Sequence, residues 1–107
     1  MSKVYIVTHA NLKPGARAAQ SAHAAFAFSI EHRDVVIDWS ESSNNLVLLE
    51  VDDEPALRKL VRDAHLQAVP YSAFHEPDFG DALTAVALGP TGMKLVSNYR
   101  LCLRDAA

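Results

Sequence analysis

The sequence predicts an α/β fold, a three-layer sandwich in which helices cover both faces of a small mixed sheet of about four strands. Short apolar runs typical of strands alternate with segments whose apolar residues recur at helical spacing, and this alternation indicates helices layered on a central sheet. Half of the residues are hydrophobic and only 7% are aromatic, so the expected core is aliphatic. A chain of 107 residues has the common length of one domain, and we expect residues 1–107 to form a single unit.

The first third of the chain predicts a strand followed by a long helix. Residues 4–8 form a short apolar run, as in a buried strand. Turn chemistry follows at residues 11–15, where a proline suits the first turn of a helix that we expect to end near Arg33. At about 100° per residue, its small and apolar residues gather on one side, which we expect to be buried. That side comprises Ala18, Ala19, Ala22, Ala25, Phe26, Ser29 and Ile30.

The rest of the chain predicts a loop, a second helix and further strands. Residues 34–45, which contain Trp39 and a polar run, are interpreted as a connecting loop. The continuous β-like run at 46–51 predicts a strand covered on both faces. Acidic residues at 52–54 suit the positive end of a second helix, which we expect to reach about residue 67. Further expected elements are strands at 71–75 and 83–88, a short helix at 91–99, and an apolar Leu-Cys-Leu run at 101–103.

Composition excludes several kinds of protein and site. The net charge of −3 and the scattered basic residues argue mildly against tight binding of nucleic acid. Cys102 is the one cysteine, which excludes an internal disulfide framework, and we expect it to be a small buried hydrophobe. The histidines lack the spacing of a helical metal pair, so we expect no metal site. No signal segment or membrane-spanning run is evident, and we expect a cytoplasmic protein.

Residues 15–24 carry the most informative motif, Gly-Ala-Arg-Ala-Ala-Gln-Ser-Ala-His-Ala. This element resembles the Gly-Lys-x-Ala-Ala-Gln-x-x-His-Ala of the type 2 peptidyl-tRNA hydrolase family. The resemblance covers roughly residues 3–97, including the segments at 49–54 and 83–90. Ala16 stands where the family has a lysine, and His9 and Asn11 stand where it tends to have arginine and aspartate.

Gln20 and His23 lie one turn apart on the same side of the predicted helix. An imidazole with its ordinary pKa near neutrality accepts and returns protons, and the resemblance implies that His23 has a catalytic role. The alternative for His23 is a half-buried ring bonded to a backbone carbonyl. Gln20 is expected to orient a carbonyl or water, and its alternative is a simple surface amide.

The resemblance also implies an acidic residue and a threonine at the site. Counted without gaps, the family's aspartate falls on Glu76, and Asp78 is the alternative because the following loop is shorter here. Either carboxylate would orient the histidine or a water, but both also fit ordinary turn chemistry. Thr84 matches a family threonine that would bind an acyl oxygen or a ribose hydroxyl, although threonine is also common in strands.

Two basic residues near the start of the helix are candidates for binding the substrate. Arg17 follows the missing lysine by one position, and a guanidinium on its long stem is a candidate to reach back to a phosphate; the alternative, which we expect, is an exposed helix arginine. If tRNA is the ligand, Arg17, Lys13 and Arg33 should line one face beside the site.

The resemblance implies a homodimeric hydrolase without metal or organic cofactor, acting on peptidyl-tRNA. Water would attack the ester between the peptide and the terminal ribose, with His23 as base or orienting group and Glu76 or Asp78 as its partner. The alternatives are a divergent, non-catalytic dimeric module for binding or regulation, and a hydrolase for a smaller ester or amide. The missing lysine and the acidic charge favour the alternatives, whereas Gln20, His23 and Thr84 favour peptidyl-tRNA.

Overall fold

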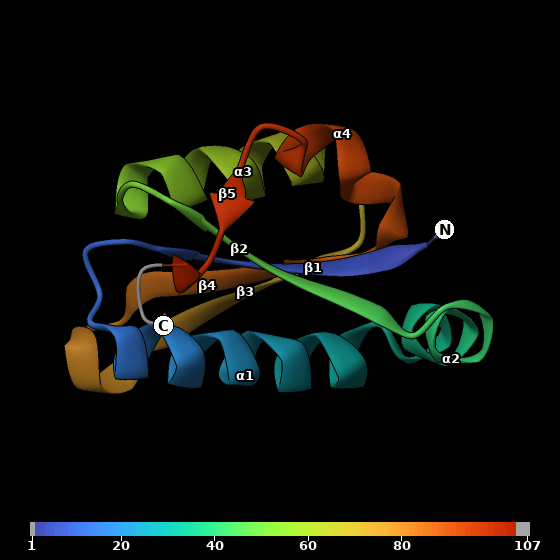
Figure 1. Ribbon diagram of the computed structural model, residues 1–107, viewed down its shortest axis with the longest axis horizontal. Helices are drawn as coiled ribbons and strands as arrows, with labels where there is room; N and C mark the ends of the chain where they lie inside the picture. Colours follow the sequence, from blue (N-terminus) through green and yellow to red (C-terminus); the bar gives the residue numbers. More distant parts are fainter. Residues whose placement is uncertain (1, 105–107) are drawn as a thin grey trace.

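The computed structural model describes residues 2–104. Over these residues the strands are β1 (Lys3–His9), β2 (Asn45–Val51), β3 (Tyr71–Glu76), β4 (Ala82–Leu88) and β5 (Arg100–Leu101). The helices are α1 (Pro14–Glu31), α2 (Arg33–Ser42), α3 (Glu54–Leu66) and α4 (Met93–Val96), with the 3-10 turns η1 (Pro77–Phe79) and η2 (Pro90–Gly92). The sheet is the middle layer, with α1 and α2 on one face and α3 and α4 on the other (Figure 1). The predicted α/β sandwich is confirmed.

The sheet is mixed, as predicted, in the order β3-β4-β1-β2-β5. β1 pairs in parallel with β2 and antiparallel with β4, while β3 and β5 add antiparallel strands at the two edges. A parallel pair needs a crossover connection, which α1 and α2 supply between β1 and β2. The described part of the chain has one strand more than the expected four, because residues 100–101 extend the sheet beside β2.

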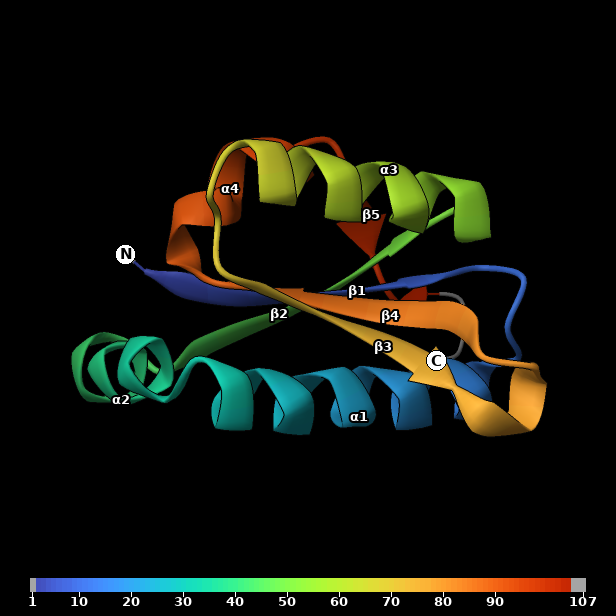
Figure 2. The ribbon, with the colours of Figure 1, turned by 180° about the vertical axis from the view of Figure 1, so that it is seen from behind.

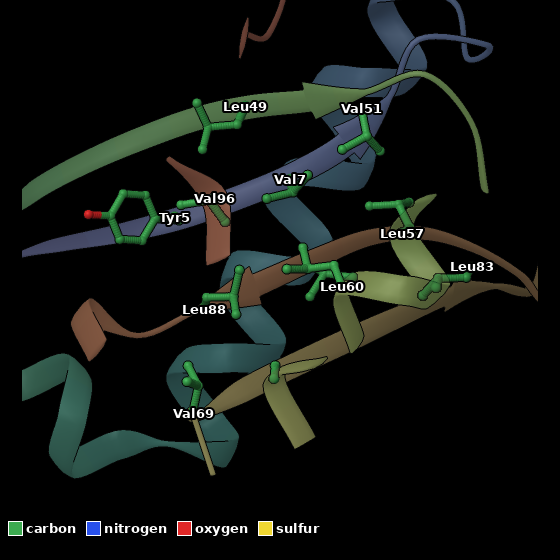
Figure 3. Close-up of a cluster of buried hydrophobic side chains, with 12 residues drawn as sticks. Tyr5, Val7, Leu49, Val51, Leu57, Leu60, Val69, Leu83, Leu88 and Val96 are labelled. Carbon is green, nitrogen blue, oxygen red and sulfur yellow. The ribbon is translucent and has the colours of Figure 1, made fainter. Parts of the chain in front are cut away.

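The apolar core on the α3 face follows the predicted pattern. Leu57, Leu60 and Ala64 are fully buried along one side of α3. They pack against Tyr5 and Val7 of β1 and against side chains of β2 and β4 (Figure 3). The side chain of Asp53 caps this helix by accepting the backbone N–H of Ala56 at 3.1 Å. An acidic residue at this position also suits the partial positive charge of the helix N-terminus.

The predicted buried face of α1 is wrong for most of its residues, although Ala25 does pack against the core. Phe26 and Ile30 are 68% and 80% exposed, and Ala18, Ala19 and Ala22 also face solvent. The buried residues are instead Arg17, Gln20, Ser21, Ala24 and Phe28. Apolar periodicity indicated the wrong side because the N-terminal half of the helix buries polar side chains. Arg17 and Gln20 have hydrogen-bond partners on the strands beneath, and the hydroxyl of Ser21 donates to the carbonyl of Arg17 within the helix.

The expected loop at 34–45 is also wrong, since most of it forms α2. Val35, Val36 and Trp39 lie on one side of this short helix and pack against the cluster around Ile6 and Phe28. The indole Nε1 of Trp39 donates to the carbonyl of Asn45 at 2.7 Å, which fixes the helix against the start of β2. Serines and acidic residues on its outer side gave the segment the composition of a loop.

The remaining elements agree with their predictions to within a few residues. The strands expected at 71–75 and 83–88 are β3 and β4, and the helix expected at 91–99 is divided into η2 and the short α4. Cys102 is half-buried rather than buried, and its backbone N–H donates to the carbonyl of Leu48 at 2.9 Å. Within residues 2–104, no helix combines the length and the apolar character needed to cross a membrane.

Candidate active site

Gln20 joins three elements beneath the N-terminal half of α1. Its side chain is only 3% exposed. The amide Nε2 donates to Glu76 Oε1 at 2.9 Å, and the amide Oε1 accepts the hydroxyl of Thr84 at 2.6 Å. Glu76 ends β3 and Thr84 lies near the start of β4, so this chain of hydrogen bonds ties the helix to both strands. We call Gln20, Glu76 and Thr84 the Gln20 network.

A β-bulge directs Thr84 toward α1. Phe74 pairs with Ala85 and His75 pairs with Leu83, which leaves Thr84 as the extra residue of β4. A bulge of this kind lets two neighbouring side chains lie on the same face of a sheet. Thr84 donates to Gln20 on the α1 face, the face on which its neighbour Ala85 also packs, whereas Leu83 packs in the core on the α3 face. The predicted site threonine therefore owes its orientation to an irregularity in the strand.

Glu76 is the acidic member of the network, and it is partly exposed. The hydrogen bond from Gln20 is the main cause that lowers the pKa of Glu76 below its ordinary value, with help from the Asp78 backbone N–H and the charge of His23. Glu76 is therefore a carboxylate at neutral pH. Of the two candidates, the geometry favours Glu76, because the Asp78 side chain is exposed and Asp78 reaches the network only through its backbone.

His23 is exposed and lies over Phe74 at the edge of the network. The two rings stack with their centroids 4.6 Å apart and their planes 4° apart. Within residues 2–104 this stacking, rather than a hydrogen bond, holds the imidazole, so its ring nitrogens are open to solvent. The expected alternative of a half-buried ring bonded to a carbonyl does not apply to His23. It does describe His32, whose Nε2 lies 2.7 Å from the carbonyl oxygen of Tyr71.

Arg17 is buried, which corrects the expectation of an exposed helix arginine. Its NH1 donates to Glu50 Oε1 at 2.6 Å, and the two side chains are 6% and 8% exposed. Arg100 donates to Glu50 Oε2 and to Asp52, both at 2.8 Å. Burial alone would raise the pKa of Glu50, but hydrogen bonds from Arg100 and Arg17 outweigh that effect and lower it. We call Arg17, Glu50, Arg100 and Asp52 the Arg17 cluster.

The other basic residues expected beside the site do not form a common face. Lys13 is exposed immediately before the first turn of α1. Arg33 begins α2, beyond the far end of an 18-residue helix that is about 27 Å long at 1.5 Å per residue. Of the three cations, only Lys13 is both exposed and close in sequence to the Gln20 network.

His9 ends β1 and faces the opposite side of the sheet from Thr8. It is 8% exposed, and its Nδ1 has no hydrogen-bond partner within residues 2–104. Burial lowers the pKa of His9, and the nearby charges of Glu54 and Asp53 oppose that shift only in part. His9 is therefore a neutral, buried imidazole at neutral pH.

Three supporting residues were not predicted from the sequence. The hydroxyl of Thr8 donates to the carbonyl of Thr84 at 2.8 Å and ties the bulge to β1. Phe74 supplies the platform for His23, and Glu50 holds Arg17. Polar residues inside otherwise apolar strands, such as Thr8 and Glu50, were the available signal, because buried polar groups need partners.

Within the described chain, no group of three or more histidine, cysteine, aspartate or glutamate side chains is placed to hold a metal ion. The model of the family Peptidyl-tRNA hydrolase PTH2 matches residues 2–104. A search among curated proteins finds no match. Because the family match covers nearly the whole sequence, the chain belongs to the peptidyl-tRNA hydrolase PTH2 family.

Proposed function

We propose that this member of the PTH2 family hydrolyses the ester between a peptide and the terminal ribose of tRNA, at the Gln20 network. The observation that carries the proposal is the hydrogen-bonded chain from Thr84 through Gln20 to Glu76. It holds an ionised carboxylate at the surface, and the pKa of Glu76 is lowered mainly by the hydrogen bond from Gln20. The fixed carboxylate of Glu76 and the accessible imidazole of His23, whose charge acts on it, are two groups of the kind that acid–base catalysis uses.

In the proposed reaction a water attacks the ester carbonyl while His23, as general base, takes its proton. Glu76 orients the water and stabilises the imidazolium that forms. The bond between the carbonyl carbon and the ribose oxygen then breaks, and His23 returns the proton to that oxygen. The products are a tRNA with a free terminal hydroxyl and a peptide with a carboxylic acid, which releases its proton to solvent and becomes a carboxylate. No metal or organic cofactor takes part in this scheme.

Gln20 and Thr84 act as positioning residues in this scheme. Both side chains are almost fully buried and bond to each other, so they reach the substrate through Glu76. The direct contact with an acyl oxygen or ribose that the resemblance implies would require the Gln20 amide to be uncovered.

A second candidate is hydrolysis of a smaller ester or amide, and one observation favours it. Arg17, the nearest substitute for the family's lysine, is bound to Glu50 within the Arg17 cluster. Ala16 has no charge, so the helix presents no exposed cation of its own beside Gln20. A substrate without phosphates would not need one.

The experiment that separates the candidates is a turnover assay on N-acetyl-aminoacyl-tRNA and longer peptidyl-tRNAs, with free tRNA as competitor over a salt series. Binding through phosphates should weaken steadily as salt rises. Restoring the lysine with Ala16→Lys should raise kcat/KM for peptidyl-tRNA, and Ala16→Gln is the uncharged control of similar length. Turnover of a simple N-acyl amino acid ester without turnover of any peptidyl-tRNA would select the second candidate.

We also propose that the chain acts as a homodimer in the cytoplasm, with the outer face of α1 as the contact. Phe26 and Ile30 are largely exposed on that face, next to Ala19 and Ala22. Exposed apolar patches of this kind commonly mark protein interfaces. Sedimentation of the wild type and of Phe26→Ser tests the contact: a dimer that Phe26→Ser leaves intact would contradict it, as would a monomeric wild type.

A further inference from the structure

The edge of the sheet formed by β3 is open. β3 is the last strand in the order β3-β4-β1-β2-β5, and it pairs with β4 alone. Figure 2 shows it at the near edge of the sheet, between α1 and α3, with no other segment of residues 2–104 in front of it. An edge strand of this kind offers unpaired backbone N–H and C=O groups to another extended chain.

The hydrogen-bond pattern identifies which backbone groups are offered. The carbonyls of Pro70 and Glu76 accept from Gly89 and Asp81, on the side of β3 that faces β4. Because the direction alternates along a strand in an antiparallel ladder, Tyr71, Ala73 and His75 point their backbone groups outward. The carbonyl of Tyr71 is already occupied by His32 Nε2 at 2.7 Å. The open stretch is therefore Ala73–His75.

Both sides of this stretch have room for side chains. On the α3 face, a hollow of about 280 Å³ is lined by Arg58, Val61, Ala73, His75 and Leu83. On the α1 face, Phe74 lies beneath the exposed ring of His23. A strand added beside β3 would direct alternate side chains into the hollow and over the His23 ring. Both sides are open, so neither would select one particular side chain of the added strand.

The open stretch leads directly to the proposed site, because Glu76 is the last residue of β3. We propose that Ala73–His75 binds the peptide part of the substrate as an added parallel strand, with its esterified C-terminus at Glu76. This inference rests on the proposed function. A hydrolase for peptidyl-tRNA meets peptides of every sequence, and backbone hydrogen bonds are the contacts that all peptides share.

The length of the edge favours a short peptide over a second copy of the chain. His32 occupies the Tyr71 carbonyl at one end, and η1 begins at Pro77 at the other. The stretch between them offers the backbone groups of two residues, far less contact than a stable protein interface requires. The same few hydrogen bonds suffice to align a peptide whose tRNA is held elsewhere.

Parallel pairing defines which amides of the peptide are engaged. One peptide residue donates its N–H to the Ala73 carbonyl and accepts the His75 N–H, and the residue two further along donates to the His75 carbonyl. The intervening residue points its N–H away from β3. Hydrogen bonds should therefore alternate along the peptide.

The test is hydrolysis of acetyl-tetrapeptidyl-tRNAs in which one backbone amide at a time is N-methylated. Methylation of alternate amides should lower kcat/KM roughly 3- to 10-fold each, the range for one hydrogen bond, while the intervening amide serves as the internal control. Side-chain changes at the same positions should matter less. Equal effects at every position, or none, with turnover retained would overturn the inference and leave the proposed function standing.

A substitution in β3 provides a second test of peptide binding at this edge. Ala73→Pro removes an outward N–H without breaking a bond to β4, which is the placement that edge strands tolerate for proline. It should reduce the ratio of kcat/KM for tetrapeptidyl-tRNA to that for N-acetyl-aminoacyl-tRNA, whereas Ala73→Ser, which keeps the N–H, should keep the wild-type ratio. A ratio that Ala73→Pro leaves unchanged would contradict the inference.

If no peptidyl-tRNA is hydrolysed, the proposed function fails, and direct binding decides about the edge. Acetyl-tetraalanine amide titrated into the ¹⁵N-labelled protein should shift the amide signals of Ala73 and His75. No shift would overturn the inference. Shifts at these amides that follow protein concentration instead of peptide, together with a dimer in sedimentation, would assign the edge to a second copy and overturn it as well.

Discussion

Two polar clusters lie one turn apart beneath α1, one around the buried Arg17 and one around the buried Gln20, and they differ in how their charged groups are paired. In the Arg17 cluster, two guanidinium groups pair with two carboxylates, so the positive and negative charges neutralise one another. In the Gln20 network, a neutral amide and a hydroxyl face a single carboxylate. In the first cluster each charged group has a partner of opposite charge. In the second, the ionised carboxylate of Glu76 is available at the surface to a substrate or water.

Arg17 and Gln20 lie on the same side of α1 but have different roles. Arg17 and Gln20 are both about nine-tenths buried or more, and both point into the sheet. Removal of one partner from a buried ion pair leaves an uncompensated charge in the interior, which is strongly destabilising. Loss of the Glu76 charge at the surface leaves no such charge inside. The Arg17 cluster should therefore govern stability, and the Gln20 network should govern turnover.

The largest expected effect is on stability, from Arg17→Ala. It leaves the buried Glu50 with Arg100 as its remaining side-chain partner, and because Arg100 still neutralises part of the charge, the free energy of unfolding should fall by about 3 kcal/mol, the lower end of the range for a broken buried pair. Arg100→Ala is the matched control: Arg100 is 43% exposed and water can replace part of its contact, so the loss should be about 1 kcal/mol. Urea unfolding measures both. Equal losses of unfolding free energy in the two variants would show that the buried Arg17–Glu50 pair stabilises the fold no more than the exposed Arg100–Glu50 pair does.

The next effect is on catalysis, from His23→Ala. If His23 transfers the proton, kcat for peptidyl-tRNA should fall by roughly 10²–10⁴-fold. The helix should persist, because alanine is the best helix former and His23 is exposed. Circular dichroism verifies folding, and Phe74→Leu, which removes the stacking platform but keeps the imidazole, should have a smaller effect. Full turnover by folded His23→Ala would remove His23 from the mechanism.

The smallest effect is a pH dependence of stability caused by His9. Burial lowers its folded-state pKa below the ordinary 6.5, so the unfolded chain binds the proton more readily. The free energy of unfolding should therefore fall as pH drops below 6.5, with a limiting slope of about 1.4 kcal/mol per pH unit for one proton. The lowered pKa values of Glu50, Glu54 and Glu76 make stability depend on pH only below the ordinary carboxyl pKa of 4.5.

Denaturant unfolding at pH 7.5 and 5.5 measures this dependence. His9→Leu should flatten it, since leucine does not titrate, and His75→Gln at an exposed position should not. An unchanged slope in His9→Leu would assign the proton uptake to another group.

Sequence periodicity predicted β1, β2, β3, β4 and α3 because their burial is apolar, and apolar spacing is what the sequence displays. It indicated the wrong face of α1 because Arg17 and Gln20 are buried through partners on distant strands, while Ser21 donates to the carbonyl of Arg17 within the helix. A hydrogen bond between residues 20 and 84 leaves no periodic signal. The family motif predicted Gln20, His23 and Thr84 as site residues, but the bulge that aims Thr84 is visible only in the strand register.

The central claim is that the chemistry belongs to the Gln20 network and not to the Arg17 cluster, and one paired measurement tests it. Peptidyl-tRNA turnover is measured for Glu76→Gln and Glu50→Gln, with each rate divided by the folded fraction. Glu76→Gln should lose roughly 100-fold or more in kcat/KM while its thermal midpoint changes little. Glu50→Gln should melt at a clearly lower temperature, yet its folded fraction should turn over within a few-fold of the wild type. Wild-type turnover by Glu76→Gln would contradict the account.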